Sequence, residues 1–228
     1  MKNLKKVLPI FLVLVILLVG GCTKNSQNGD NITNEFHGKE LPIMLSEDIS
    51  IEEAFLYNGE FVEDGSFSKT DNVFALKVKN ISNKAIQLVR IYVVTDKNEY
   101  FFEITTLPAG RLLTVLEKTG KTITDEEKIV EIREENKIFF ENGLSLHASE
   151  FELSPKDKVF NIKNITDTDY SSDVYVYFKR VDANGDYLGG ITFRSNAGKL
   201  KADEFKQIPA PHFIKENSEV LFVDYAKQ

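Results

Sequence analysis

Apolar and polar side chains alternate with a period of two along much of this chain, as they do in β-strands that bury one face. Residues 74–78 and 174–178 both place large apolar side chains at every second position. Asn-Gly pairs, which favour tight turns, occur at positions 58, 142 and 184. Two sheets with one apolar face each must cover one another, so the pattern predicts an all-β protein built of antiparallel sandwiches.

The chain also repeats itself 84 residues further on (139 − 55 = 84). This offset places Lys-Asn-Ile-Ser at 79–82 over Lys-Asn-Ile-Thr at 163–166. Other residues that it superimposes are Phe55 with Phe139, Leu76 with Phe160, and Val78 with Ile162. Self-similarity at a fixed period indicates duplicated structural units. We therefore predict two homologous domains, at residues 45–133 and 134–228.

The segment 125–140, at the domain boundary, fits two patterns. Ile129 and Ile132 share one face of a possible helix, which would make the segment a helical linker. The run 128–132 is also similar to 218–223, which ends the second repeat. We prefer a strand that closes the first domain and leads into the opening strand of the second.

A short basic head, with lysines at 2, 5 and 6, precedes an apolar run at 7–19. This run has 13 residues, whereas a membrane-spanning helix needs about 20. We therefore expect an export signal that is removed. The sequence Leu-Val-Gly-Gly-Cys at 18–22 resembles a bacterial lipoprotein box. The resemblance implies a signal peptide at 1–21 and a lipidated Cys22; the alternative is a buried cysteine after an ordinary signal.

Removal of residues 1–21 takes away three lysines and changes the formal charge from −7 to −10. The chain has no cluster of Lys and Arg of the kind that binds phosphate backbones, so we exclude nucleic acid as a partner. Residues 22–44 are largely polar, and we predict that they form a flexible tether. Because Cys22 is the single cysteine, its lipidation leaves none for a disulfide or for thiol catalysis.

The pattern from Val78 to Ser82, followed by a turn, an alternating strand and Asp-x-Asn, resembles bacterial extracellular immunoglobulin-like modules of the FxLYD type. The segment 92–96 (Tyr-Val-Val-Thr-Asp) keeps the aromatic, aliphatic and Asp positions, whereas 178–182 keeps only Phe and Asp. The resemblance implies tandem immunoglobulin-like β-sandwich domains on a surface lipoprotein. It implies neither a ligand nor a reaction.

Few residues suggest catalysis or metal binding. The three histidines lack metal-ligand spacing, and no nucleophile elbow, phosphate loop or His-Glu-x-x-His motif occurs. We predict no enzyme activity and no cofactor. Asp167, Asp169 and Asp173 crowd one loop and are weak candidates for binding calcium. A solvated acidic turn is the alternative that we favour.

Four tyrosines are the candidate partner-binding residues: Tyr170, Tyr175, Tyr177 and Tyr187. Tyr175 and Tyr177 should lie on the face of their strand opposite Val174 and Val176. Tyrosine offers a large, stiff contact area with a polar end, so these side chains predict an aromatic patch for glycan or protein. Cross-strand pairing, or burial against the first domain, is the alternative.

Together these features predict a non-catalytic binding module that is lipid-anchored to the outer face of a bacterial cell membrane. The expected partner, besides the membrane, is an envelope protein or polymer. The alternatives are an accessory subunit of an envelope complex and a hydrolase with an unrecognised site.

Overall fold

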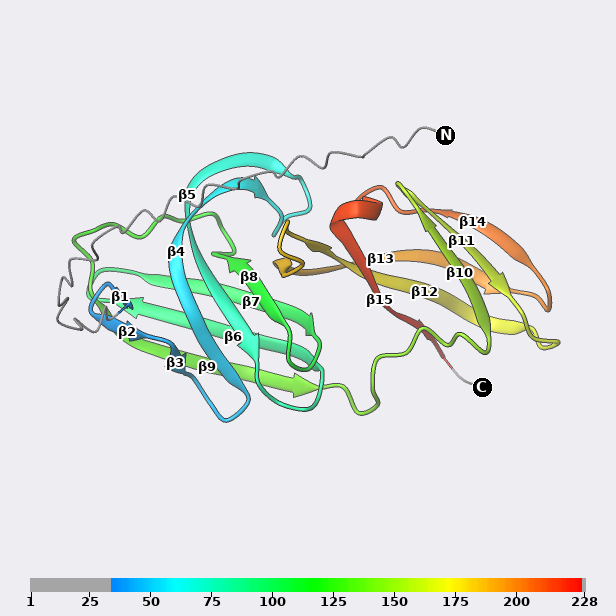
Figure 1. The fold of residues 1–228 in the computed structure, drawn as a ribbon, viewed down its shortest axis with the longest axis horizontal. Helices are drawn as coiled ribbons and strands as arrows, with labels where there is room; N and C mark the ends of the chain where they lie inside the picture. Colours follow the sequence, from blue (N-terminus) through cyan, green and yellow to red (C-terminus); the bar gives the residue numbers. More distant parts are fainter. Residues whose placement is uncertain (1–33, 227–228) are drawn as a thin grey trace, which may run out of the picture. The chain divides into compact units, whose positions relative to one another are not determined.

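The computed structural model describes residues 34–226, which fold as one all-β unit (Figure 1). The first half holds β1 (Asn34–Phe36), β2 (Lys39–Leu41), β3 (Ile43–Met44), β4 (Ile49–Phe61), β5 (Ser68–Asn80), β6 (Ile86–Thr95), β7 (Glu99–Leu107), β8 (Leu112–Leu116) and β9 (Ile129–Phe139). After a connector at 140–150, the second half holds β10 (Phe151–Lys156), β11 (Val159–Asn164), β12 (Tyr170–Val181), β13 (Tyr187–Leu200), β14 (Phe205–Pro209), the 3₁₀ turn η1 (Lys215–Asn217) and β15 (Ser218–Tyr225).

Each half packs two sheets around an apolar core. In the first half, β4, β5 and β8 cover β7, β6 and β9, and aromatic residues such as Phe74 and Phe102 meet edge to face at 5.2 Å. In the second half, β10, β11 and β14 cover β13, β12 and β15 around Phe160 and Phe178. The predicted all-β class is confirmed, and the layers are those of a β-sandwich.

The two halves use the same strand pairings. The antiparallel pairs β4–β5, β5–β8, β6–β7 and β6–β9 correspond in order to β10–β11, β11–β14, β12–β13 and β12–β15. The 84-residue offset holds for β5 and β11, but the alignment of Phe55 with Phe139 is wrong. The register places Ile49 opposite Asn80 and Phe151 opposite Asn164, because the β4–β5 hairpin is much longer than β10–β11.

Asn80 and Asn164 hold equivalent positions at the ends of β5 and β11. Both side chains are 0% exposed. Their Nδ2 groups donate to backbone carbonyls at 2.8–2.9 Å, those of Lys84 and Leu107 for Asn80 and those of Thr168 and Lys201 for Asn164. Each Oδ1 accepts the backbone N–H and the hydroxyl of the residue two positions later, Ser82 or Thr166. One buried amide therefore ties together the loops at that end of each half.

The segment at 129–139 is the strand β9, which confirms the predicted closing strand of the first domain and rules out the helical linker. It pairs with β6 from Ile129 opposite Thr95 to Phe139 opposite Ile86. The expected domain boundary at 133/134 falls inside this strand. No strand follows it directly, because the connector separates β9 from β10.

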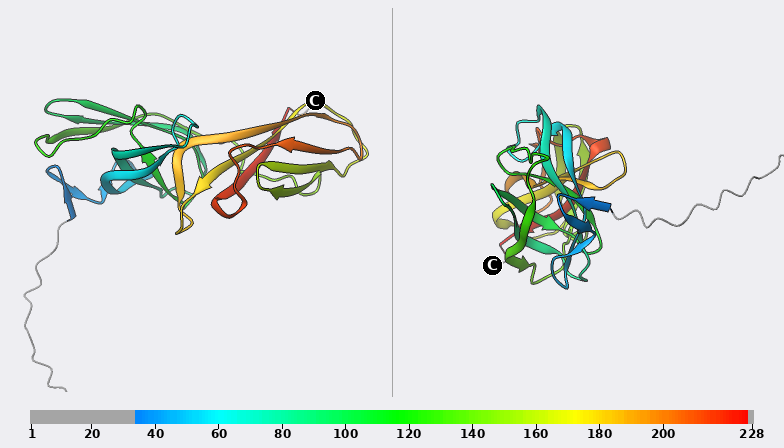
Figure 2. Two further views of the ribbon diagram at one scale, coloured as in Figure 1. Left: turned by 90° about the horizontal axis from the view of Figure 1, so that it is seen from above. Right: turned by 90° about the vertical axis from the view of Figure 1, so that its left-hand side faces the viewer.

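One sheet passes from the first half into the second. β13 lies beside β8 in parallel, with Tyr187 opposite Leu113 and Leu188 opposite Thr114 (Figure 2). The resulting sheet has seven strands in the order β15-β12-β13-β8-β5-β4-β3. The sequence predicted antiparallel pairing throughout, so this parallel pair was not expected. Alternation within either repeat does not show how the two repeats contact one another.

Part of the predicted tether is structured. Residues 34–44 contain β1, β2 and β3, whereas 22–33 lie outside the described residues. His37 (φ 48°) and Gly38 (φ 83°) form the two-residue turn between β1 and β2, a combination typical of a type I′ hairpin. Phe36 stacks on the core residue Phe74 with ring centroids 5.6 Å apart, so this hairpin belongs to the fold.

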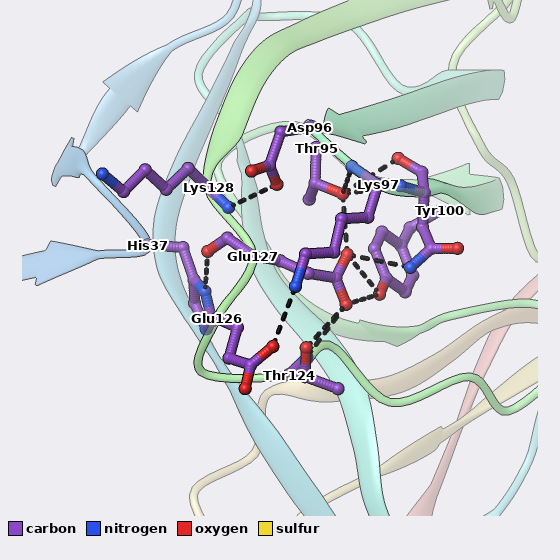
Figure 3. Close-up of polar contacts among 10 residues, drawn as sticks. His37, Thr95, Asp96, Lys97, Tyr100, Thr124, Glu126, Glu127 and Lys128 are labelled. Atoms are coloured by element: carbon purple, nitrogen blue, oxygen red, sulfur yellow. Dashed lines mark hydrogen bonds and ion pairs between the residues drawn. The ribbon is translucent and has the colours of Figure 1, made fainter.

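The carboxylate of Glu127 organises the loop before β9 (Figure 3). This side chain is 2% exposed. Its oxygens accept hydrogen bonds from the Tyr100 hydroxyl (2.8 and 2.9 Å), the Thr95 hydroxyl (2.7 Å), the Asn98 amide (3.1 Å), and the N–H and hydroxyl of Thr124 (both 3.1 Å). The carbonyl of Glu127 also contacts His37 Nδ1 at 2.8 Å, which links the β1–β2 hairpin to this loop.

These donors fix the charge of Glu127. Burial alone would raise the pKa of the carboxyl group, but the hydrogen bonds from Thr95, Tyr100 and Asn98 outweigh burial and lower the pKa to about 2. The depressed pKa means that the stabilisation is complete above the ordinary value of 4.5 and is lost as the pH falls towards 2.

We expect Glu127→Gln to lower the free energy of unfolding by about 2 kcal/mol at pH 7, because charge-assisted hydrogen bonds are lost. The difference from the unsubstituted protein should shrink between pH 4.5 and pH 2. Urea unfolding across this range measures both effects. Glu126→Gln is the control, because Glu126 makes only an exposed ion pair with Lys97. An equal cost at pH 7 and pH 2.5 would contradict the assignment.

Candidate binding groove

A groove of about 690 Å³ opens between the connector and the edge strand β15. The connector lines one side from Phe140 to Ser145, and β15 lines the other from Phe222 to Tyr225. The N–H of Val223 donates to the carbonyl of Ser145 at 2.9 Å and ties the two sides together. Gln87 of the first half completes the wall, so both halves contribute to the groove.

Three aromatic rings in contact, Tyr177, Phe222 and Phe140, form a ladder that leads into this groove from the outer face of β12. Tyr177 lies opposite Phe222 in the register of β12 and β15, and the two rings stack with centroids 4.3 Å apart and an interplanar angle of 6°. Phe222 in turn meets Phe140 edge to face at 5.4 Å. Phe222 is only 8% exposed, and Tyr177 is half-buried; both rings pack with the core of the first half, as the alternative of burial against the first domain anticipated for Tyr177.

A polar cluster closes one end of the groove. Glu150 accepts hydrogen bonds from the hydroxyls of Tyr170 (2.6 Å) and Tyr225, and His147 Nδ1 lies 3.3 Å from its other oxygen. The hydrogen bonds from Tyr170 and Tyr225 lower the pKa of Glu150 in spite of its burial. Burial and the same carboxylate raise the pKa of Tyr225. Glu150 is therefore held ionised and serves as an acceptor rather than as a general acid.

Tyr175 lies beyond the ladder on the same outer face. The side chains alternate as predicted, with Val174 and Val176 buried on the opposite side. The guanidinium of Arg194 sits 5.0 Å from the ring centroid of Tyr175, and the hydroxyl of this tyrosine donates to Asp173 at 3.3 Å. One face of the ring is thus covered by a cation, and the hydroxyl already has a protein partner.

The fourth predicted tyrosine does not belong to this surface. Tyr187 is 1% exposed and packs in the core of the first half, beside Leu113 of β8. Its hydroxyl donates to Glu219 at 3.0 Å, and Arg111 lies 4.5 Å from its ring centroid. The expectation that Tyr187 binds a partner is therefore wrong. The cause is the junction between the halves, which buries the start of β13.

The three aspartates proposed for calcium do not converge. Asp169 accepts the N–H of Ala202 at 2.8 Å, and Asp173 accepts the Asn196 amide at 3.0 Å. Asp167 is exposed and contacts the hydroxyl of its neighbour Thr168. Within residues 34–226, no group of three or more His, Cys, Asp or Glu side chains is arranged to hold a metal ion. Each carboxylate instead stabilises a turn or a strand end.

Cys22, the proposed lipidation site, lies outside the described residues. No helix in the part of the chain that the structure describes is long and apolar enough to cross a membrane.

Lys179 and Glu63 are among the buried charged residues that the sequence did not predict. Lys179 follows Tyr177 on the outer face of β12, where alternation predicts contact with solvent, yet its side chain is 0% exposed. Glu63, two residues after the end of the long β4, is 4% exposed. The junction between the two halves buries both: Glu63 of the first half accepts the N–H of Gly190 in the second, and Lys179 lies against the same segment of β13. This is a tertiary effect that no local pattern reveals.

No family model and no curated protein matches this chain.

We expect Tyr187→Ala to lower the free energy of unfolding by about 3–5 kcal/mol, because it removes a fully buried ring. Tyr175→Ala should cost less than about 1 kcal/mol, since this ring lies at the surface. Denaturant titration of the two variants measures the difference. Similar losses for both substitutions would contradict the placement of Tyr187 in the core.

Proposed function

We propose that this chain is a lipid-anchored protein of a bacterial cell envelope and acts as a non-catalytic binding module. Its binding surface is the groove between the connector and β15, together with Tyr177 and the outer face of β12. The expected partner is an envelope protein or an envelope polymer. The observation that carries this proposal is the groove itself, which combines apolar and hydrogen-bonding groups in one concave surface.

The chemistry of the groove favours binding over catalysis. Phe140, Leu144 and Phe222 supply apolar contacts, whereas Asn142, His147 and Asp224 supply donors and acceptors along the rim. Glu150, the carboxylate nearest to His147, is occupied by two tyrosine hydroxyls. A stiff aromatic ladder with polar ends is typical of surfaces that recognise glycans or peptides.

The repeated topology supports tandem immunoglobulin-like domains. In each half, one sheet has the order first-second-fifth strand and the other has the order fourth-third-sixth. This arrangement resembles the A-B-E and C′-C-F strands of an immunoglobulin domain without strand G. The proposal therefore assigns β4–β9 and β10–β15 to two related modules that share a sheet.

The anchor is proposed from the first 22 residues alone. The apolar run at 7–19 and the small residues before Cys22 fit an export signal with lipid attachment. Two or more acyl chains hold a protein stably on a bilayer, whereas one chain holds it only marginally.

We expect Cys22→Ala to release the protein from the membrane. In a bacterial host, the unsubstituted chain should partition into the detergent phase, and its mature N-terminal peptide should carry lipid by mass spectrometry. Thr23→Ala is the matched control and should stay with the membrane. A Cys22→Ala chain that remains in the detergent phase would disprove lipid anchoring without affecting the binding proposal.

The binding surface is tested in intact cells with a photocrosslinking amino acid at Asn142, inside the groove, or at Lys69, on the exposed β4–β5 hairpin. We expect a specific adduct from Asn142 only. Gly143→Trp should abolish it, because a side chain at Gly143 enters open space and fills the groove. Asp167→Trp is the matched control and should leave it unchanged. The same adducts from both positions would reject the groove as the binding surface.

A further inference from the structure

A buried lysine lies where the two halves meet. The ammonium group of Lys179 donates to three successive backbone carbonyls of β13, those of Gly189 (3.1 Å), Gly190 (2.9 Å) and Ile191 (2.7 Å). Successive carbonyls of a regular strand point to alternate sides, so β13 must depart from regular geometry here. The register confirms this: two steps of β12, from Phe178 to Arg180, lie opposite five steps of β13, from Phe193 to Leu188.

This irregular segment of β13 is the part that touches the first half. Gly189 adopts φ +88°, and a Cβ at Gly190 would collide with the backbone carbonyl of Glu103 in β7. Thr105 Oγ1 donates to the carbonyl of Gly190 at 3.1 Å, and Thr192 Oγ1 donates to the carbonyl of Thr105 at 2.6 Å. Lys179 thus shapes the backbone through which the second half contacts the first.

Glu63 approaches the same point from the first half. Its Oε1 accepts the N–H of Gly190 at 2.8 Å and the N–H of Leu116, at the end of β8, at 3.0 Å. One oxygen therefore bridges the two halves. The other, Oε2, is buried and has no hydrogen-bond partner within residues 34–226. A buried carboxylate oxygen without a donor is energetically unfavourable, and a proton would relieve the charge.

We call the contact of Gly189–Ile191 with Glu63, Glu103 and Thr105 the joint between the two halves. The other charged groups around this joint already have partners. They are Lys118 with Glu103 (3.6 Å), Arg90 with Glu103 (3.0 Å), Arg180 with Glu60 (3.6 Å), Lys77 with Asp186 (3.0 Å), and Glu117, which accepts backbone N–H groups from Thr119 and Lys121. The opposite charges of Glu63 and Lys179 favour each other's ionised forms, and the positive charge of Lys118 favours the ionised form of Glu63 and disfavours that of Lys179. Burial is nevertheless the largest influence on both groups.

We propose that Glu63 and Lys179 make the joint between the two halves sensitive to protons. Closing the joint removes both charged groups from water, and the closed arrangement becomes more stable when either group is neutral. A neutral Lys179 still donates two hydrogens to the surrounding carbonyls, and a protonated Glu63 still accepts backbone N–H groups through Oε1. The strength of the joint therefore depends on the pH outside the cell.

The direction of this dependence follows from proton binding. Burial lowers the pKa of Lys179 from 10.5 to about 7, so between these values the open joint binds more protons than the closed joint. Closing releases a proton there, and the closed joint gains stability as the pH rises. Burial raises the pKa of Glu63 above 4.5, so the closed joint also gains stability as the pH falls towards 4.5. The joint is weakest between these two ranges.

The backbone N–H groups of Gly190 and Leu116 report directly on the joint, because both donate to Glu63. We would measure their hydrogen-exchange protection by NMR in the Cys22→Ala chain from pH 5 to pH 9, corrected for intrinsic exchange rates. Above pH 7 the protection should rise, approaching about tenfold per pH unit. The amide of Ile162, in the core of the second half, should show no such rise.

Lys179→Met should abolish the rise above pH 7, whereas Glu63→Gln should keep it and lose the gain in protection as the pH falls towards 5. Lys77→Met, which removes a different ion pair between the halves, should keep both. If Lys179→Met does not fold, the ¹³Cε shift of Lys179 in the parent chain replaces that variant and should titrate near neutral pH. Flat protection in the parent chain, a rise that persists in Lys179→Met, or titration of Lys179 only above pH 10 would each overturn the proposal.

Discussion

The structure depends on the contact between β13 and β8, where one sheet continues from the first half into the second. The parallel pair itself is only two residues long, Tyr187 with Leu113 and Leu188 with Thr114, and so short a pairing is weak alone. Side chains strengthen it: Arg111 bonds to Glu219 at 2.8 Å and Lys77 to Asp186 at 3.0 Å. Tyr187 inserts into the core of the first half. Burial of an aromatic ring contributes more than either ion pair, so apolar packing holds the joint and the polar groups fix its geometry.

Within each half, the corresponding constraint is the buried asparagine at the end of the second sandwich strand. The loop after Asn80 reads Ile-Ser-Asn-Lys and the loop after Asn164 reads Ile-Thr-Asp-Thr, yet the two asparagines make the same kinds of hydrogen bond. An amide supplies two donors and an acceptor that can satisfy several buried backbone groups at once. Leaving those groups unpaired would be costly, which explains why the Asn-Ile-Ser/Thr pattern is the clearest part of the internal repeat.

The features that could be predicted from the sequence are those that local chemistry determines. Alternation located the strands around Phe74 and Val176, and the repeat anticipated the matching topology of the two halves. The exposure predicted for a side chain was wrong where one half covers the other. Tyr187 and Lys179 both look solvent-exposed in their own strand patterns, and only the junction buries them. The alignment of Phe55 with Phe139 failed for a different reason. The β4–β5 hairpin is longer than β10–β11, so the similarity between the segments around Phe55 and Phe139 is coincidental. The groove could not be predicted from the sequence either, because one side of it is an irregular connector without hydrophobic periodicity.

The joint and the groove are mechanically connected through β12. Lys179 and Tyr177 lie two positions apart on the same face of this strand, and Tyr177 stacks on Phe222 in the groove wall. Phe222 meets Phe140, which directly follows the last strand of the first half. A displacement of one half relative to the other would therefore move Phe140 against Phe222 and change the width of the groove. We infer that a proton-dependent change at Lys179 reaches the proposed binding surface through β12, whose pairing with β15 shifts register between Tyr177 and Phe178.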